Sequence, residues 1–217
     1  IYGPRDEVDL DGIRNIGLPF WLAGSFGGPV KLDEALKVGA AGIQVGTPFA
    51  FCDESGITEG IKQKIIRRAL EGKGEVLTDP LASPSGFPFK VVEMEGSVSE
   101  KEIYEARPRI CDLGYLRRTY AKGNGIFGYR CPSEDVEAFL KKGGKIEDTS
   151  GRKCICNGLV STIGFPQIRP SGYREVPIVT AGDDLKLIAR FVKKGKFSYS
   201  AEDVIRYILD RGNGKEI

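Results

Sequence analysis

Apolar and polar positions at the start of the chain predict strands that alternate with helices. A short apolar run over residues 20–23 ends at a glycine and is typical of a buried strand, and a second run over 42–45 stops at Gly46. Apolar residues at helical spacing predict one helix that begins near Pro29 and another over about 58–70. This order of elements predicts parallel strands joined by helical crossovers.

The pattern changes after residue 74. Residues 81–88 are rich in Pro, Ser and Gly, which predicts an ordered loop, and residues 89–93 predict one further short strand. Beyond them the chain predicts mostly helices, with a boundary near residue 95 between an α/β part (1–95) and a helical, cysteine-containing part (96–217). The expected starts of these helices are Ser99 with Glu102, Ser133, Asp183, and Ser200 with Asp203.

Composition indicates an ordinary globular protein. Hydrophobic residues make up 41% and charged residues 29%, and 32 basic against 30 acidic residues leave a net charge of +2. This balance argues against a nucleic-acid-binding protein, which usually carries a basic excess. No run approaches the roughly 18 apolar residues of a membrane span, and no secretion signal opens the chain. We therefore expect a cytoplasmic protein that binds neither nucleic acid nor membrane.

Histidine is absent from the chain. Within these residues its absence excludes Ser-His and Cys-His nucleophile pairs, zinc sites with histidine ligands and histidine general bases. The chain begins at Ile1 and its single methionine is Met94. We interpret it as a fragment or a processed piece of a longer polypeptide.

Glycines follow both of the first two predicted strands. Residues 23–28 read Ala-Gly-Ser-Phe-Gly-Gly and open onto a helix, and Gly46 with Thr47 follows the second strand. Bare backbone N–H groups at such turns suit a phosphate monoester, and in a (β/α)₈ barrel the loops after consecutive late strands form such sites. The alternative is that these glycines only permit tight turns. Two successive glycine turns favour the phosphate site.

Residues 19–56 (PFWLAGSFGGPVKLDEALKVGAAGIQVGTPFAFCDESG) resemble the late strands of the nitronate monooxygenase, or 2-nitropropane dioxygenase-like, family. The match is most specific over residues 39–49, and the resemblance covers at least the first 90 residues. It implies an α/β fold: the C-terminal part of a flavin-binding (β/α)₈ TIM barrel, followed by a mainly helical C-terminal extension.

The resemblance also implies site residues. The phosphate of FMN would be held by backbone amides of Gly24, Ser25, Gly46 and Thr47, with Gln44 on the cofactor side of its strand. Ser25 stands where the family commonly has a second glycine, and it keeps the backbone donor and adds a hydroxyl. The family's usual proton-abstracting base is a histidine from an earlier part of the barrel. Either it lies in the missing N-terminal portion or this branch uses other chemistry, so no catalytic residue is assigned here.

The implied function is FMN-dependent oxidation of a small-molecule nitronate by O₂ to a carbonyl compound and nitrite. Only two or three barrel strands are present, so a missing N-terminal portion or a partner chain must supply the rest, and residues 1–217 alone should be inactive. The sequence is also compatible with a homo-oligomer. Two alternatives remain: a flavin-dependent enoyl reductase of fatty-acid or polyketide synthesis, and a non-catalytic metal-binding module formed by residues 96–217.

Five cysteines without a secretion signal favour reduced thiols or a metal site over disulfides. Cys52 is expected to be a buried apolar residue. The other four lie within 46 positions and could bind zinc or an iron–sulfur cluster, although no CxxC pair is present. Reduced packing thiols are the favoured interpretation, and we expect the four to lie close together in space. They are Cys111, Cys131, Cys154 and Cys156.

Overall fold

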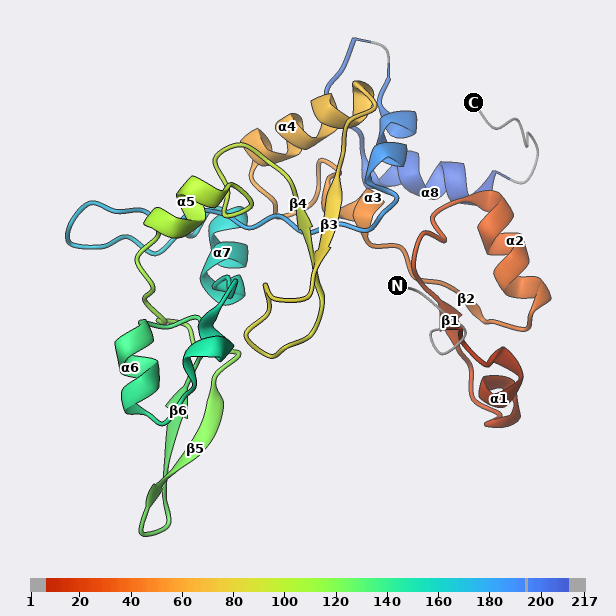
Figure 1. Cartoon of the computed structure of the whole chain (residues 1–217). Helices are drawn as coiled ribbons and strands as arrows, with labels where there is room; N and C mark the ends of the chain where they lie inside the picture. The colour runs from red at the N-terminus through yellow and green to blue at the C-terminus, as the bar shows by residue number, and fades with distance from the viewer. Residues whose placement is uncertain (1–6, 194, 211–217) are drawn as a thin grey trace.

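The computed structural model describes residues 7–193 and 195–210, and its elements are shown in Figure 1. The strands are β1 (Trp21–Leu22), β2 (Gly42–Ile43), β3 (Val76–Asp79), β4 (Phe89–Val92), β5 (Arg118–Gly123) and β6 (Ile126–Arg130). The α-helices are α1 (Leu10–Asn15), α2 (Pro29–Lys37), α3 (Thr47–Ala50), α4 (Glu59–Leu70), α5 (Lys101–Ala106), α6 (Val136–Lys141), α7 (Ile155–Thr162) and α8 (Ala201–Leu209). Two 3₁₀ helices are η1 (Ile146–Thr149) and η2 (Leu185–Phe191).

The first strands and helices form where the sequence predicts, but β1 is not the buried strand that was expected. Trp21 is 53% exposed, because the described sheet has only two strands and leaves this side chain uncovered. β1 and β2 pair in parallel, and α2 connects them with Pro29 as its first residue. α4 buries Ile61, Ile65 and Ala69 as expected. Leu70 was also predicted on the buried face, but it is 45% exposed. The buried face of α4 includes Ile66 instead.

A second sheet is antiparallel and joins β3 to β4. β4 confirms the strand predicted at residues 89–93, and residues 81–88 between the two strands form the expected loop. β3 was not predicted, because Val76 and Leu77 are followed by polar residues and show no clear alternation. Asp79 at its end organises the loop by accepting hydrogen bonds from the backbone N–H groups of Leu81 and Ala82.

The later part of the chain contains a β-hairpin that the helical pattern did not predict. β5 and β6 pair antiparallel around Asn124 and Gly125, which both adopt positive φ. In Figure 1 the hairpin projects from one end of the molecule. Ile126, Phe127 and Tyr129 on β6 are each more than half exposed.

Two of the expected helix caps are wrong. The Ser99 hydroxyl hydrogen-bonds the backbone of Met94 instead, and α5 begins at Lys101 without a side-chain cap. Ser133 donates to the carbonyl of Lys153, and α6 is capped by Asp135. In both cases a neighbouring backbone group competes successfully for the hydroxyl.

The other two predicted helix starts agree better with the structure. The helix predicted from Asp183 is the 3₁₀ helix η2, which begins after Asp184. The capping box of Ser200 with Asp203 at α8 is confirmed.

The larger hydrophobic core joins residues from both sides of the boundary expected near residue 95. It contains residues of the α3–α4 region, such as Phe51 and Ile65, together with Leu185, Ile188 and Val204 from η2 and α8. Figure 1 shows the blue C-terminal helices beside the orange α3 and α4. The C-terminal segment therefore folds back onto the first part of the chain.

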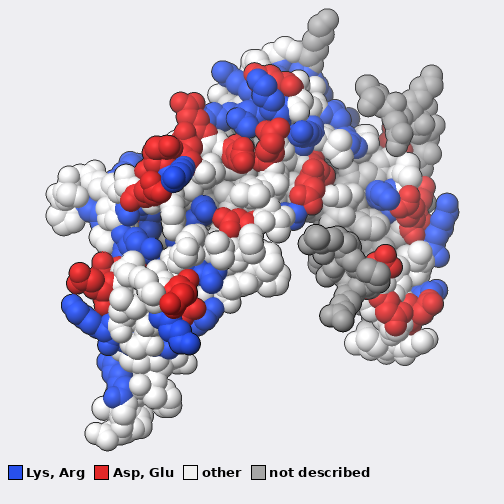
Figure 2. Space-filling model, in the orientation of Figure 1, with Lys and Arg blue, Asp and Glu red and all other residues white. Residues whose placement is uncertain are grey.

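The described residues form three two-stranded sheets, and none of these sheets closes into a barrel. Lys and Arg side chains are interspersed with Asp and Glu over the face seen in Figure 2. In the part of the chain that the structure describes, no helix has both the length and the apolar character needed to cross a bilayer.

Candidate functional site

The parallel pairing of β1 and β2 brings the two glycine turns to one edge. Trp21 pairs with Gly42 and Leu22 with Ile43, and the amide of Gln44 donates to the carbonyl of Leu22 at 2.8 Å. Both strands run in the same direction, so residues 23–28 and 44–47 leave the sheet at the same carboxyl edge. This is the edge at which ligands bind in parallel α/β folds.

The first turn uses an unusual backbone conformation. Gly24 has φ +86° and Ser25 has φ +62°. A positive φ is uncommon for a residue with a side chain, so the exposed Ser25 carries backbone strain at this turn. No atom lies within 4 Å of the position that a Cβ at Gly24 would occupy. The backbone of this turn therefore faces open space.

The two turns contact each other through Gly27. A Cβ built at Gly27 would lie 3.2 Å from Cγ1 of Val45 and 3.5 Å from Cγ of Pro48. A larger residue at this position would push the second turn away. Here the glycine has a packing role, as the tight-turn interpretation of the sequence expected. Gly46 differs, because no atom lies within 4 Å of its Cβ position.

Thr47 ties the second turn to a distant segment. Its side chain is buried, and Oγ1 accepts a 2.8 Å hydrogen bond from the backbone N–H of Gly182. A Cβ at Gly182 would lie 2.9 Å from this oxygen and 2.7 Å from a carboxylate oxygen of Asp184. Sequence reasoning missed the segment around Gly182, although a glycine followed by two aspartates is a recognisable turn signal.

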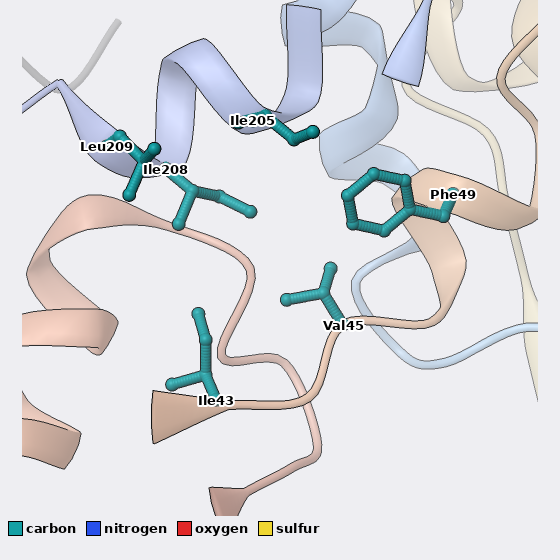
Figure 3. Close-up of a pocket in the computed structure, with 6 residues that line it drawn as sticks. All are labelled: Ile43, Val45, Phe49, Ile205, Ile208 and Leu209. Atoms are coloured by element: carbon teal, nitrogen blue, oxygen red, sulfur yellow. The ribbon is translucent and has the colours of Figure 1, made fainter. Parts of the chain in front are cut away.

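Gln44 is exposed, and the residues on either side of it, Ile43 and Val45, line an apolar groove. The groove has a volume of about 240 Å³ and lies between the second turn and α8. Figure 3 shows its six apolar side chains, which come from the two sides of the groove. They are Ile43, Val45, Phe49, Ile205, Ile208 and Leu209.

Cys52 is a buried apolar residue, as expected. It is 3% exposed, belongs to the larger core, and its thiol donates to the carbonyl of Phe49 at 3.2 Å. Burial raises the pKa of the Cys52 thiol. It lies in the core rather than at the open face of the turns.

Three of the other cysteines, Cys111, Cys131 and Cys154, lie within electrostatic range of one another. The thiols of Cys111 and Cys131 hydrogen-bond each other, and Cys154 is close enough for its charge to act on both. Cys156 interacts electrostatically with Cys154. Over residues 7–193 and 195–210, no group of three or more Cys, Asp or Glu side chains is arranged to hold a metal ion. Zinc or a cluster at these cysteines stays a prediction.

Burial and neighbouring charges give these thiols different pKa values. The hydrogen bond from Cys131, with Arg117 beside it, lowers the pKa of Cys111 to about 6. The same hydrogen bond and burial raise the pKa of Cys131. Burial raises the pKa of Cys154 to about 11. Of Cys111, Cys131 and Cys154, Cys111 is therefore the thiol that ionises most readily.

A buried ion pair lies next to the cysteines. Arg107 donates to both carboxylate oxygens of Glu175, at 2.5 and 3.2 Å, and both side chains are almost fully buried. The side-chain amide of Asn157 on α7 bridges this pair to the Cys111 loop by donating to Glu175 and to the carbonyl of Ile110. The pair joins segments 68 positions apart, and sequence pattern gave no signal for it.

Comparison with known proteins gives a partial match. A segment of 86 residues is 31% identical to a Mycobacterium tuberculosis (strain H37Rv) protein named (3aS,4S,5R,7aS)-5-hydroxy-7a-methyl-1-oxo-octahydro-1H-indene-4-carboxyl-CoA dehydrogenase. The segment is 40% of this chain and spans 23% of that dehydrogenase. No model of a known protein family matches the chain, and no solved structure matches it. A dehydrogenase is an oxidoreductase, so the comparison agrees with that general class and does not bear on nitronates.

Proposed function

We propose that this chain is part of an FMN-dependent oxidoreductase and holds the phosphate of the cofactor between the turns that follow β1 and β2. The observation that carries the proposal is the parallel pairing of these strands, which places two glycine turns in contact at one carboxyl edge. The partial similarity to a dehydrogenase supports the oxidoreductase class.

The residues of the two turns fit a phosphate group. Gly24 and Gly46 leave open the space that a side chain would fill, so an anion can approach their backbone N–H groups. The Thr47 hydroxyl accepts a hydrogen bond from Gly182, and in this proposal its own proton would be donated to a phosphate oxygen. Ser25 adds a second hydroxyl at the first turn.

Bound FMN would supply the electron transfer, and this chain would supply binding and orientation. The turns fix the phosphate end of the cofactor through backbone donors held on paired strands. The hydrogen bond that Gly182 donates to the Thr47 hydroxyl holds the second turn against the C-terminal segment. With no histidine in the chain, the proton-abstracting group of the family belongs to the rest of the barrel, in the same polypeptide or in a partner chain.

Nitronate oxidation by O₂ is the reaction we propose, on the resemblance of residues 19–56 to the nitronate monooxygenases. A flavin-dependent enoyl thioester reductase is the second candidate, and one observation favours it: the similar dehydrogenase is named for a carboxyl-CoA compound. The full-length protein should release nitrite from a nitronate in the presence of O₂. Consumption of NAD(P)H with an enoyl thioester, and no reaction with nitronates, would select the second candidate.

The position of the cofactor is tested by a pair of glycine variants. Gly46→Leu fills the open space at the second turn and should abolish retention of flavin by the full-length protein. Gly60→Leu is the matched control, because Gly60 on α4 also has no atom within 4 Å of its Cβ position and has no positive φ. Flavin content is measured from the absorption spectrum and by chromatography of the released cofactor. A folded Gly46→Leu variant with stoichiometric FMN would show that the site is wrongly placed.

The same spectrum tests the third alternative. A metal-binding module in residues 96–217 without flavin would show no flavin absorption, and it would bind a metal through the four later cysteines. Residues 1–217 alone should turn over no nitronate, because two parallel strands do not close a barrel. Turnover by this chain without any partner would overturn that expectation.

A further inference from the structure

The β5–β6 hairpin carries a local excess of positive charge. Residues 113–133 contain four basic side chains and no Asp or Glu. The basic residues are Arg117, Arg118, Lys122 and Arg130. The acidic residues that flank this stretch are paired elsewhere, Asp112 with Arg169 and Glu134 with Lys142. In Figure 2 the projecting hairpin is blue and white. The net charge of +2, which argued against nucleic-acid binding, is an average that conceals this segment.

The four basic side chains keep their charge. Among the described residues, none of them forms an ion pair with a carboxylate. Arg118 donates to the carbonyl of Pro84 at 2.8 Å. Arg130 donates to the carbonyl of Lys142 at 2.6 Å, so the base of the hairpin is tied to the rest of the molecule. A carbonyl is a neutral acceptor and cancels no charge. Because Lys122 near the turn is also exposed, the positive charge extends from the base of the hairpin to its turn.

One face of the hairpin is filled by its own side chains. Tyr120 pairs with Gly128 across the ladder. A Cβ at Gly128 would lie 2.6 Å from Cε1 of Tyr120 and 2.6 Å from Cε of Lys122, so these two side chains cross the glycine. The guanidinium of Arg130 lies over the Tyr120 ring, 5.3 Å from its centroid. This face therefore presents charge, and its aromatic ring is already engaged.

The opposite face presents two uncovered aromatic rings. Phe127 is 69% exposed and Tyr129 is 60% exposed. Their partners across the ladder are the small residues Ala121 and Thr119, which leave the ring faces open. In the part of the chain that the structure describes, no second ring and no cation stacks on either of them. Alternate residues of a strand share a face and lie about 7 Å apart, so the two rings form a row along β6.

We propose that the β5–β6 hairpin binds single-stranded nucleic acid. Successive bases stack on Phe127 and Tyr129, and the basic side chains of the hairpin bind the phosphates. Stacking on exposed aromatic rings holds bases without a sequence preference, and neighbouring cations follow the backbone. A duplex keeps its base faces inside its own stack, whereas a single strand can present them to a row of rings. The ligand therefore supplies both the negative charge and the planar surfaces that this hairpin lacks.

A bilayer and a second copy of the chain fit the hairpin less well. The turn at its tip is formed by Asn124 and Gly125, with Lys122 close by. Insertion of the tip into a bilayer would bury a lysine and an asparagine, which is costly in hydrocarbon. Pairing of two hairpins through their strand edges would bring the basic residues of both copies together, and like charges across a sheet are destabilising.

The test measures the affinity of the full-length protein for labelled oligouridine and oligothymidine of about a dozen nucleotides. Fluorescence anisotropy is recorded over a range of salt concentrations. We expect the logarithm of the binding constant to fall with the logarithm of salt concentration, with a slope of up to about −3 for four phosphate contacts. Phe127→Ala and Tyr129→Ala should each weaken binding about 5- to 150-fold through the loss of one stacked base. Lys122→Gln should reduce the size of the slope by about 0.7.

Two substitutions outside the hairpin are the matched controls. Phe165→Ala removes a ring that is 71% exposed and follows α7. Lys73→Gln removes an exposed lysine that is paired with Glu71 at 3.0 Å. Both variants should bind the oligonucleotides as the parent protein does. Urea denaturation of every variant checks that it is folded, and the exposed positions of the two hairpin rings predict that their loss leaves folding intact.

Any of four results would overturn the proposal. The first is no binding of either oligonucleotide at low salt. The second is an affinity that both Phe127→Ala and Tyr129→Ala leave unchanged. The third is tighter binding of a duplex of the same length than of the single strand, because a duplex cannot stack on the rings. The fourth is binding to vesicles that contain phosphatidylserine without binding to the oligonucleotides, which would identify the hairpin as a membrane-binding element.

Discussion

Replacing Thr47 by valine isolates the hydrogen bond that connects the second glycine turn to the C-terminal segment. Valine keeps the shape and burial of threonine and removes only the hydroxyl that accepts the 2.8 Å bond from Gly182. A buried amide left without an acceptor costs about 1–3 kcal/mol of unfolding free energy. Gly182 is half-buried, so water can reach part of this N–H, and we expect a loss of about 1–2 kcal/mol, in the lower part of that range. For a chain of this length this corresponds to a melting temperature lower by roughly 2–8 °C.

Thr47→Ser is the matched control. It keeps the hydroxyl and removes one buried methyl group, which should cost about 0.8 kcal/mol. Urea denaturation of the two variants and the parent protein measures these losses, and flavin content is measured on the same samples. Thr47→Val should lose stability and flavin, and Thr47→Ser should keep flavin. A valine variant as stable as the parent would refute the structural role of the bond. Full flavin retention in a destabilised valine variant would show that the hydroxyl does not contact the cofactor.

Two further predictions concern the packing that supports the site. Glu175→Gln removes the charge that balances buried Arg107 and should lower the unfolding free energy by about 3–5 kcal/mol in urea denaturation; a loss below about 1 kcal/mol would show that the pair is dispensable. Gly158→Ala should destabilise the protein although alanine favours helices, because its Cβ would lie 2.6 Å from Cγ2 of Ile178. Gly60→Ala in the exposed first turn of α4 should instead stabilise by about 0.5–1 kcal/mol, and the same sign for both variants would contradict this reasoning.

Local pattern was sufficient for the elements whose residues interact within a few positions. The parallel strands, the start of α2 at Pro29, the buried face of α4 and the capping box of α8 all follow from spacing and from residue type. Hairpin β5–β6 was missed because alternating aromatic residues there lie among charged and glycine residues, in a stretch whose flanks have helical spacing. The Ser99 cap failed because a closer partner, the backbone of Met94, captured its hydroxyl.

The sequence by itself determined the positions of both glycine turns, and with them the candidate residues Gly24, Ser25, Gly46 and Thr47. Only the tertiary structure decided what surrounds those turns. The partner of Thr47 lies 135 positions away, and the core joins Phe51 to Val204. The contact of the Cys111 and Cys131 thiols likewise depends on the path of the hairpin. Periodicity and capping act over a few residues along the chain, whereas these contacts depend on how distant segments are brought together when apolar surface is buried.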